Sequence, residues 1–522
     1  MAGLVLLAPL FLVATYATLR LVRRRTQRQG LPLPPGPSSL PLFGNALSID
    51  LDEPWKTYTN WAAIYGDLMY LQILDQDIIV INSQADAVQL FEKSSAIYSD
   101  RPFFAFRVPF GMECNFGLAP YGDHWRLCRR IFHQTFRPEA ALNLRSSQLR
   151  RARQMVLNMI EDPAEYPFHY ATFAVSLSIS AVYGYEPRPR EDPLVQSVEH
   201  FNKASIPASS VATQLVLKLF PFVLRLPDWF PVLSVKQQSV WARKCAEDMV
   251  ETPHQYVQKQ MEDSNGMPVK SMVSDHLTRM QKYDETYRAK YESALKAASA
   301  GAHIGSLETT SSSLMVFTLA MVMNPDVLKH AQTEIDAVVG TERLPEFQDR
   351  INLPYVEAVL RETVRWQPIL PLGVPHATTK SDVYKGFHIP KGATVFGNAW
   401  AMSRDESRYP NASQFNPGRF FNADGTLNDD EPQSFAFGFG RRICPGRYVG
   451  DASLWSSIAT MLATLDFAWA KDAQGRDVVF EPTYENSLVQ HSRPADFPCS
   501  ISPRLHIDKI ALEAMIARMD LT

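Results

Sequence analysis

A cysteine in a glycine-rich loop is the residue whose surroundings point most clearly to chemistry. Cys444 lies in the segment 434–450, two residues after Arg442 and close to Gly438, Gly440 and Gly446. A cysteine that binds a metal must lose its proton, so the anion needs positive charge or backbone donors nearby. Arg442 is such a charge, and glycines let the chain turn tightly and bring N–H groups close to the sulfur. The segment therefore indicates a thiolate that ligates a metal.

The spacing around Cys444 adds a family resemblance. A lone cysteine is usually a small buried hydrophobic residue. Here the pattern Phe-x-x-Gly-x-Arg-x-Cys-x-Gly, which begins at Phe437, resembles the cysteine-ligand loop of the cytochrome P450 family at every defined position. The resemblance implies haem b, with Cys444 as the axial ligand to its iron and Arg442 as the partner of a haem propionate. Pro445 and the residues after it favour a helix whose positive end faces the thiolate.

Three further residues are candidates to hold the haem propionates. A helix is expected to begin near Asp123, with Asp123 as a possible cap. Trp125 and Arg129 are four residues apart and share a face of that helix. They resemble the Trp-x-x-x-Arg pair that hydrogen-bonds propionates in the family, although a core tryptophan beside a solvated arginine is the alternative. The resemblance also places His376 at a propionate, whereas a lone histidine is more often structural or exposed.

Oxygen activation is expected on a long central helix. The segment 302–310 resembles the family's Ala/Gly-Gly-x-Asp/Glu-Thr-Thr sequence. The resemblance implies that Thr309 hydrogen-bonds dioxygen and that Glu308 feeds protons through water. Gly305 and Ser306 are small enough to open the helix beside the haem, but Ser306 stands where glycine is usual, which puts the groove geometry in question. In isolation, Thr309 is better read as a helix residue that bonds back to its own turn.

A buried ion-pair cluster is expected downstream of this helix. Glu362 and Arg365 lie three residues apart on a helix predicted over 352–367 and share a face. Without other information, such a pair is usually a surface salt bridge that contributes little to stability. The pair resembles the family's Glu-x-x-Arg motif, which implies a buried cluster completed by Arg419. Gly418 stands where the family commonly has glutamate, a departure that leaves the arginine in place.

The N-terminus is predicted to be a membrane anchor. Residues 1–19 contain no charged side chain, and about 20 apolar residues span a bilayer core. A basic and Pro-rich linker over 20–37 follows, which would be stiff and extended. Positive charge after the apolar run predicts a single-pass transmembrane helix with the body in the cytosol, and a cleaved signal peptide is the alternative. The order of apolar segment, basic cluster and Pro-rich segment resembles that of microsomal members of the family. The resemblance implies that the protein is located in the endoplasmic reticulum membrane.

The rest of the chain reads as one large domain. The 522 residues are 46% hydrophobic, and the net charge of −3 gives no reason to expect nucleic acid as a partner. The five cysteines include no Cys-x-x-Cys pair, which argues against a disulfide framework and for a reducing compartment. Two strands are expected within 67–81, and more than one helix within 268–325. The predicted fold is mainly α with a small β subdomain, the cytochrome P450 fold, as a single catalytic domain over 38–510 before a tail over 511–522.

The substrate is predicted only by class. The resemblance implies a pocket lined from five apolar and aromatic segments, although the same residues would also suit a core. These segments are 103–110, 201–219, 298–305, 369–374 and 487–490. Such a lining suits a lipophilic small molecule. Residues 398–405 and the pair Tyr409-Pro410 resemble fungal members, which implies a secondary metabolite such as a terpenoid, polyketide or indole.

The predicted reaction is a monooxygenation. An NADPH-cytochrome P450 reductase would deliver electrons, one atom of O2 would enter the substrate and the other would leave as water. Two other classes stay open: a haem-thiolate isomerase or dehydratase that needs no reductase, and a non-catalytic haem protein of the same fold. The pair Glu308-Thr309 argues against the first, because that chemistry has little use for a proton relay. The intact ligand, propionate and oxygen-activation positions argue against the second.

Overall fold

The computed structural model describes residues 28, 30–41, 43–227, 234–263, 269–486, 492–504, 507 and 509–520. The predicted anchor over 1–19 lies outside this range, as do most of its basic flank and the predicted pocket turn 487–490. Within the described ranges, no single helix is long and apolar enough to cross a membrane. Two consecutive helices, Glu285–Met323 and Pro325–Val338, reach that length and apolarity only when taken together across a 105° bend.

The chain divides into two compact units. The first comprises Met1–Pro102 and Pro375–Asn398, and the second Phe103–Val374 and Ala399–Thr522. The prediction of a mainly helical protein with a small β region is confirmed, because helices dominate the second unit and the four-stranded sheet lies in the first. The predicted catalytic domain over 38–510 spans both units, and its bounds stay a prediction.

The first unit is built on a four-stranded sheet in the order β1-β2-β6-β3. The predicted hairpin is confirmed: β1 (Leu68–Ile73) pairs antiparallel with β2 (Gln76–Ile81), and the last four residues of β2 are buried. β2 continues in parallel with β6 (Thr394–Gly397), which pairs antiparallel with β3 (His376–Ala377). The unit's other elements include α2 (Pro54–Tyr65), α3 (Gln84–Ala87), the π-helix η2 (Val88–Lys93), α4 (Ser95–Tyr98), β4 (Asp382–Tyr384) and β5 (Phe387–Ile389).

The second unit is mainly helical, with two small two-stranded sheets. Its helices are α5 (Asp123–Phe136), α6 (Pro138–Ala141), α7 (Arg145–Glu161), α8 (Tyr166–Tyr183), α9 (Pro193–Ser209), α10 (Val211–Leu219), α11 (Ser234–Asp263), α12 (Met272–Met280), α13 (Glu285–Met323), α14 (Pro325–Val338), α15 (Pro354–Trp366), α16 (Ala399–Ser403), α17 (Gln433–Ala436), α18 (Arg447–Thr464) and α19 (Lys509–Asp520). Its sheets pair β7 (Leu465–Trp469) with β10 (Cys499–Pro503), and β8 (Tyr484–Asn486) with β9 (Ser492–Pro494).

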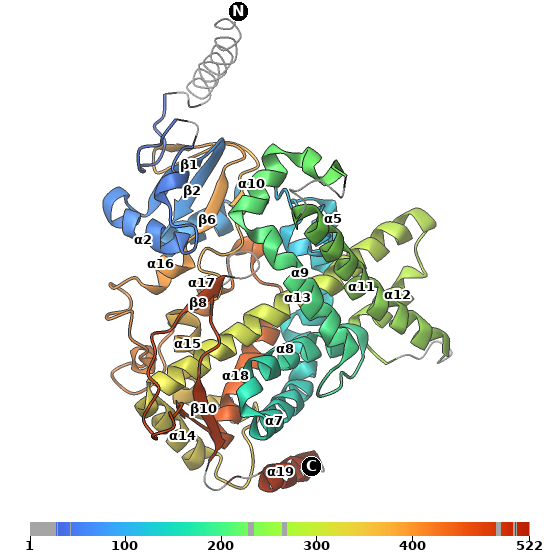
Figure 1. The fold of residues 1–522 in the computed structure, drawn as a ribbon, viewed down its shortest axis with the longest axis vertical. Coiled ribbons are helices and arrows are strands. Elements are labelled where there is room, and N and C mark those ends of the chain that lie inside the picture. Colours follow the sequence, from blue (N-terminus) through green and yellow to red (C-terminus); the bar gives the residue numbers. More distant parts are fainter. Residues whose placement is uncertain are drawn as a thin grey trace, which may run out of the picture. The chain divides into compact units, whose positions relative to one another are not determined.

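Helix α13 runs through the middle of the second unit (Figure 1). Asp284 caps its start, since its carboxylate accepts a hydrogen bond from Tyr287 N, and the helix ends at Met323 before Pro325. It packs against α5, α8, α15 and α18, and most of its residues from Ala294 onward are buried. A helix surrounded in this way holds its side chains in fixed directions, so α13 is suited to position reactive groups.

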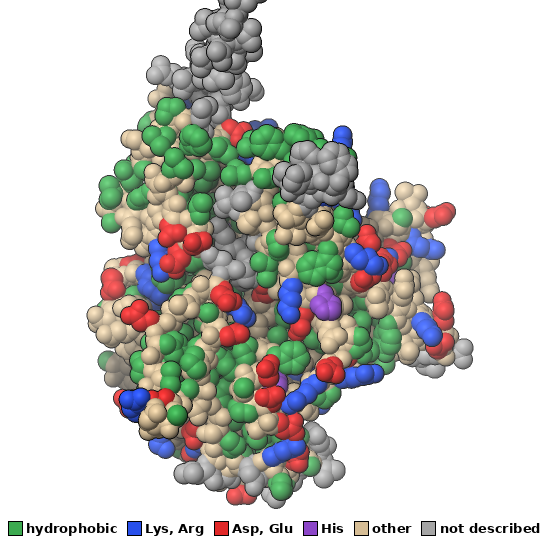
Figure 2. All heavy atoms as spheres, in the orientation of Figure 1, with side chains coloured by type: hydrophobic (Ala, Val, Ile, Leu, Met, Phe, Trp, Pro, Cys, Tyr) green, Lys and Arg blue, Asp and Glu red, His purple; other side chains and the backbone are tan. Residues whose placement is uncertain are grey.

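Charged side chains of both signs are interspersed on the face of the molecule shown in Figure 2. Exposed ion pairs include Lys244 with Asp248, where Nζ and Oδ1 are 2.8 Å apart, and Arg150 with Glu186 at 3.0 Å. Exposed pairs of this kind contribute little to stability. The stability of the second unit therefore depends mainly on its buried helix contacts.

Candidate functional site

The Cys444 loop is held in shape by two glycines and one backbone hydrogen bond. Gly438 and Gly440 have φ angles of +75° and +54°, a region in which other residues are strained. The backbone N–H of Cys444 donates to the carbonyl of Phe437 at 2.8 Å, which closes the loop. Helix α18 begins at Arg447 with Gly446 as its cap residue, so the predicted helix just beyond the cysteine is confirmed.

The Cys444 thiol lies among donors and cations. Burial raises the pKa of the thiol above its usual range, and the backbone N–H of Gly446 and the charges of Arg129 and Arg447 offset only part of this rise. The guanidinium of Arg447 also donates to the carbonyl of Cys444 at 3.1 Å. The site thus has groups that stabilise an anionic sulfur, which a thiolate ligand requires.

Helix α5 brings Trp125 and Arg129 to this loop. Arg129 donates to the carbonyl of Ile443 at 2.7 Å. Arg442 donates to the carbonyl of Ala119 at 2.9 Å, and its guanidinium carbon lies 4.3 Å from the centre of the Trp125 ring. The structure therefore brings together Trp125, Arg129, Arg442 and the loop that carries Cys444. Their predicted contacts with propionates stay a prediction.

The predicted cap of α5 was wrong. The cap residue is Gly122, and Asp123 lies inside the first helical turn, where its carboxylate pairs with Arg126 at 2.6 Å. An acid in the first turn still suits the positive end of the helix. The start of the helix was therefore located correctly, and only the role of the aspartate differs.

Helix α13 has an open face at Gly305. This residue is exposed although Leu307, Glu308 and Thr310 beside it are buried. A Cβ atom added at Gly305 would meet no other atom within 4 Å. Thr309 is half-buried one turn later, and its hydroxyl donates to the carbonyl of Gly305 at 2.6 Å. The hydroxyl of Thr309 thus makes the back-bond typical of helical threonine, at the edge of an open surface.

Ser306, which stands in the place of a glycine, is engaged with α8. Its Oγ lies 3.0 Å from Ser178 Oγ and 3.2 Å from the carbonyl oxygen of His303, so its one O–H can donate to either partner. Ser178 Oγ is also 3.0 Å from His303 Nδ1. Because the serine hydroxyl is bound toward α8, it is not directed into the open face at Gly305. Ser306 therefore adds a contact between α13 and α8, and its effect on the groove beside the haem stays a prediction.

Glu308 is buried and is bound by a residue from another helix. Its Oε1 accepts a hydrogen bond from Asn202 Nδ2 on α9 at 2.7 Å. Helix α13 packs on α5 and on α18, the helices that carry Arg129 and follow Cys444. Glu308 and Thr309 therefore belong to the same helical assembly as the cysteine loop.

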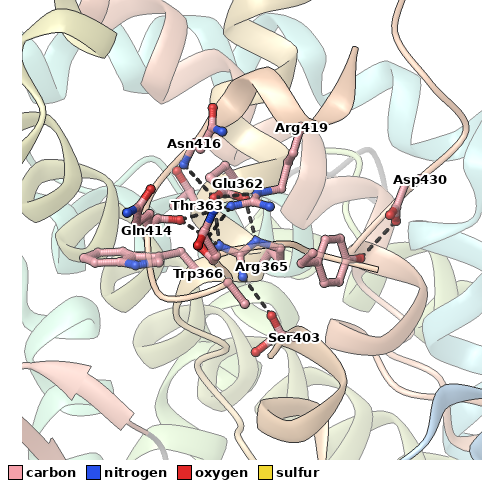
Figure 3. Close-up of polar contacts among 12 residues, drawn as sticks. Glu362, Thr363, Arg365, Trp366, Ser403, Gln414, Asn416, Arg419 and Asp430 are labelled. Carbon is pink, nitrogen blue, oxygen red and sulfur yellow. Dashed lines mark hydrogen bonds and ion pairs between the residues drawn. The ribbon is translucent and has the colours of Figure 1, made fainter. Parts of the chain in front are cut away.

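The predicted ion-pair cluster is present and buried (Figure 3). Arg365 donates from Nε to Glu362 Oε2 at 2.6 Å and from Nη2 to Oε1 at 2.7 Å. Arg419 Nε donates to Glu362 Oε1 at 3.2 Å, and the backbone N–H of Asn416 donates to the same oxygen at 2.7 Å. Arg365 also donates to the carbonyl of Ser403 at 2.7 Å. The cluster joins α15 to the segments that precede the cysteine loop.

His376 lies in the first unit, on strand β3. Its Nδ1 donates to the carbonyl of Tyr98 at 2.6 Å, and its ring packs on Phe91 with centroids 4.3 Å apart. Both partners belong to the same unit. Its predicted contact with a propionate stays a prediction.

These residues fit a haem group. The fit rests on the thiol surrounded by an N–H donor and two arginines, on Arg442 stacked over Trp125, and on the open face at Gly305. Sequence reasoning missed Arg447 and Asn202. Arg447 follows Cys444 by three residues and could have been found from that spacing, whereas Asn202 is 106 residues from Glu308 and gives no local signal.

Comparison with known proteins shows the family of this chain. The sequence model of the family described as Cytochrome P450 matches residues 34–498. Cytochrome P450 monooxygenase 176 of Postia placenta is 33% identical over 504 residues, which cover 96% of this chain and 95% of the relative. Cytochrome P450 monooxygenase ple1 of Rhodocybe pseudopiperita is 37% identical over 478 residues, 90% of each chain. This chain belongs to the cytochrome P450 family of haem-containing monooxygenases.

Proposed function

We propose that this protein inserts one oxygen atom from O2 into a lipophilic small molecule, with electrons supplied by an NADPH-cytochrome P450 reductase. The observation that carries the proposal is that two features occur in the same helical unit. One is a half-buried cysteine whose thiol lies near an N–H donor and two arginines, and the other is a central helix that is open at Gly305 and Thr309. Haem, when bound, would supply the iron at which O2 is reduced.

The residues of the chain have distinct roles in this proposal. Cys444 would ligate the iron as a thiolate, and Arg129 and Arg447 would stabilise its charge. Arg442 and Trp125 would hold a propionate, with His376 as a further donor. The hydroxyl of Thr309 would donate to dioxygen in place of the Gly305 carbonyl. Glu308 would pass protons to the dioxygen through water.

The substrate is proposed to be a fungal secondary metabolite, such as a terpenoid, polyketide or indole. The relatives named above are fungal monooxygenases, and two of the segments proposed as pocket lining are rich in apolar residues. In the segment 103–110, Phe106 and Phe110 are buried and Phe103 is exposed; in the segment 201–219, Phe201 is buried. A lining of this kind favours a lipophilic ligand.

The proposed ligand is tested by the difference spectrum of the reduced protein with carbon monoxide. The wild-type protein should give a Soret band at the position of thiolate-ligated haem, and the Cys444→Ser variant should lack it. Cys114→Ser is a matched control, because Cys114 is a second free cysteine in the same unit. A thiolate band in Cys444→Ser would overturn the assignment of the ligand.

The reaction type is tested by NADPH consumption with a panel of terpenoids, polyketides and indoles. We expect NADPH oxidation that depends on both reductase and substrate and gives a product heavier by one oxygen atom. Product formed without reductase would instead indicate an isomerase or dehydratase. Haem binding with no turnover of any compound under either condition would favour a non-catalytic protein.

A further inference from the structure

We propose that Asn202 is a positioning residue for Glu308, and that its amide orients the acid on α13. This inference rests on the proposed function, in which Glu308 passes protons. The contact is short and links two helices: Asn202 Nδ2 on α9 donates to Glu308 Oε1 on α13 at 2.7 Å. Glu308 is only 9% exposed, and a carboxylate at this depth needs hydrogen-bond donors. Asn202 is one such donor.

The chemical type of this partner suits an acid that must gain and lose a proton. A neutral amide N–H can donate to a carbonyl oxygen of the carboxyl group in either protonation state. A lysine or arginine at the same place would favour the ionised carboxylate and oppose protonation. The amide can therefore fix the direction of the side chain without fixing its charge.

The contact also joins the acid to the proposed substrate pocket. Asn202 follows the buried residue Phe201, at the start of the segment 201–219 that is proposed to line the pocket. Helix α9 packs on α8, α10, α11 and α13. A substrate that moves α9 would thus act on the orientation of Glu308 through one hydrogen bond.

The contact itself is tested by a double-mutant cycle in urea unfolding of the haem-loaded protein. The variants are Asn202→Leu, Glu308→Leu and both together, with Gln196→Leu as a control at an exposed position of α9. Asn202→Leu should lower the folding equilibrium constant about tenfold in the wild-type background, the upper end of the range for an intramolecular hydrogen bond. In the Glu308→Leu background the same change should have a much smaller effect. Equal effects in both backgrounds would overturn the contact.

The role in proton delivery is tested by the share of NADPH electrons released as hydrogen peroxide with reductase and substrate present. Asn202→Leu and Glu308→Leu should each raise this share severalfold, and the double variant should resemble Glu308→Leu alone. Asn202→Gln, which keeps the amide, should restore part of the coupling, whereas Gln196→Leu should match the wild type.

The two proposals fail in different ways. If Glu308→Leu leaves the peroxide share unchanged, the proton role of Glu308 is wrong, and the functional part of this inference with it. If Glu308→Leu raises the share but Asn202→Leu does not, the proton role stands and the positioning role of Asn202 is wrong.

Discussion

Gly301 and Gly305 lie one turn apart on α13 but have different surroundings. A Cβ atom at Gly305 would meet no atom within 4 Å, whereas one at Gly301 would lie 2.6 Å from the buried ring of Phe116. Replacing an exposed helical glycine with alanine stabilises a protein by about 1 kcal/mol, and overpacking a core destabilises it by about 1–3 kcal/mol. Gly305→Ala should therefore raise, and Gly301→Ala lower, the urea midpoint of the haem-free protein.

The same pair of variants also tests what faces Gly305. If haem and its ligands use this open face, Gly305→Ala should weaken imidazole binding in a Soret titration even though it stabilises the helix. A stabilised variant with wild-type imidazole affinity would show that the open face is not the ligand side of the haem.

His303 gives a prediction about pH. Burial lowers the pKa of His303 from an ordinary value of 6.5 to about 3. The unfolded chain therefore binds this proton at a higher pH than the folded chain does. The neutral side chain contributes its full stability above pH 6.5, and the contribution is lost as the pH falls toward about 3.

His303→Gln should make the free energy of unfolding fall less steeply between these pH values, by up to about 1.4 kcal/mol per pH unit. Urea unfolding of the wild-type protein and the variant across this range measures the slope. His200→Gln on α9 is the control, because His200 is exposed. Equal slopes for wild type and His303→Gln would contradict the prediction.

At the scale of elements, the Glu362 cluster ties α15 to the chain before the cysteine loop. Arg365 and Glu362 have fully buried side chains, so removing Arg365 takes two hydrogen bonds from Glu362 and leaves it with Arg419 and the N–H of Asn416. Breaking a buried pair in this way is strongly destabilising, by about 3–5 kcal/mol. Arg365→Ala should therefore lower the yield of haem-loaded protein sharply, as measured by the reduced carbon monoxide spectrum per mole of chain.

The control for this prediction is Lys244→Ala, which breaks the exposed pair with Asp248 on α11. It should leave haem content and the urea midpoint unchanged, because exposed ion pairs contribute little. Wild-type haem content in Arg365→Ala would show that the cluster does not support the haem-binding fold.

Interactions between residues that are close in the sequence could be predicted, whereas those between residues far apart in the sequence could not. The hairpin at 67–81 is predicted by two apolar runs around a polar turn, and helix α15 by Pro354 near its first turn and Pro368 after its end. The partners Glu362 and Arg365 were predicted because they are three residues apart on one helix. Gly122 was missed as the cap of α5 because the acid after it is an equally good signal at a helix start. Asn202 was missed because only the packing of α9 on α13 brings it to Glu308.

At the scale of the whole molecule, the family match crosses the boundary between the two units. It covers residues 34–498, whereas the first unit contributes both the start of the chain and 375–398. His376 lies in this second part of the first unit, and Cys444 lies in the second unit. The family match therefore covers the proposed site residues of both units.

We propose that the N-terminal segment anchors the chain in the endoplasmic reticulum membrane. Residues 1–19 carry no charge and are followed by five arginines within 20–28. Insertion of a transmembrane helix is effectively irreversible. The full chain should therefore remain in the membrane pellet after washing with alkaline carbonate, and a variant lacking residues 1–27 should move to the supernatant. The carbon monoxide spectrum of the truncated variant controls for folding. If the truncated protein stays in the pellet with a normal spectrum, the residues after 27 bind the membrane themselves, and the anchor is not what holds the protein there.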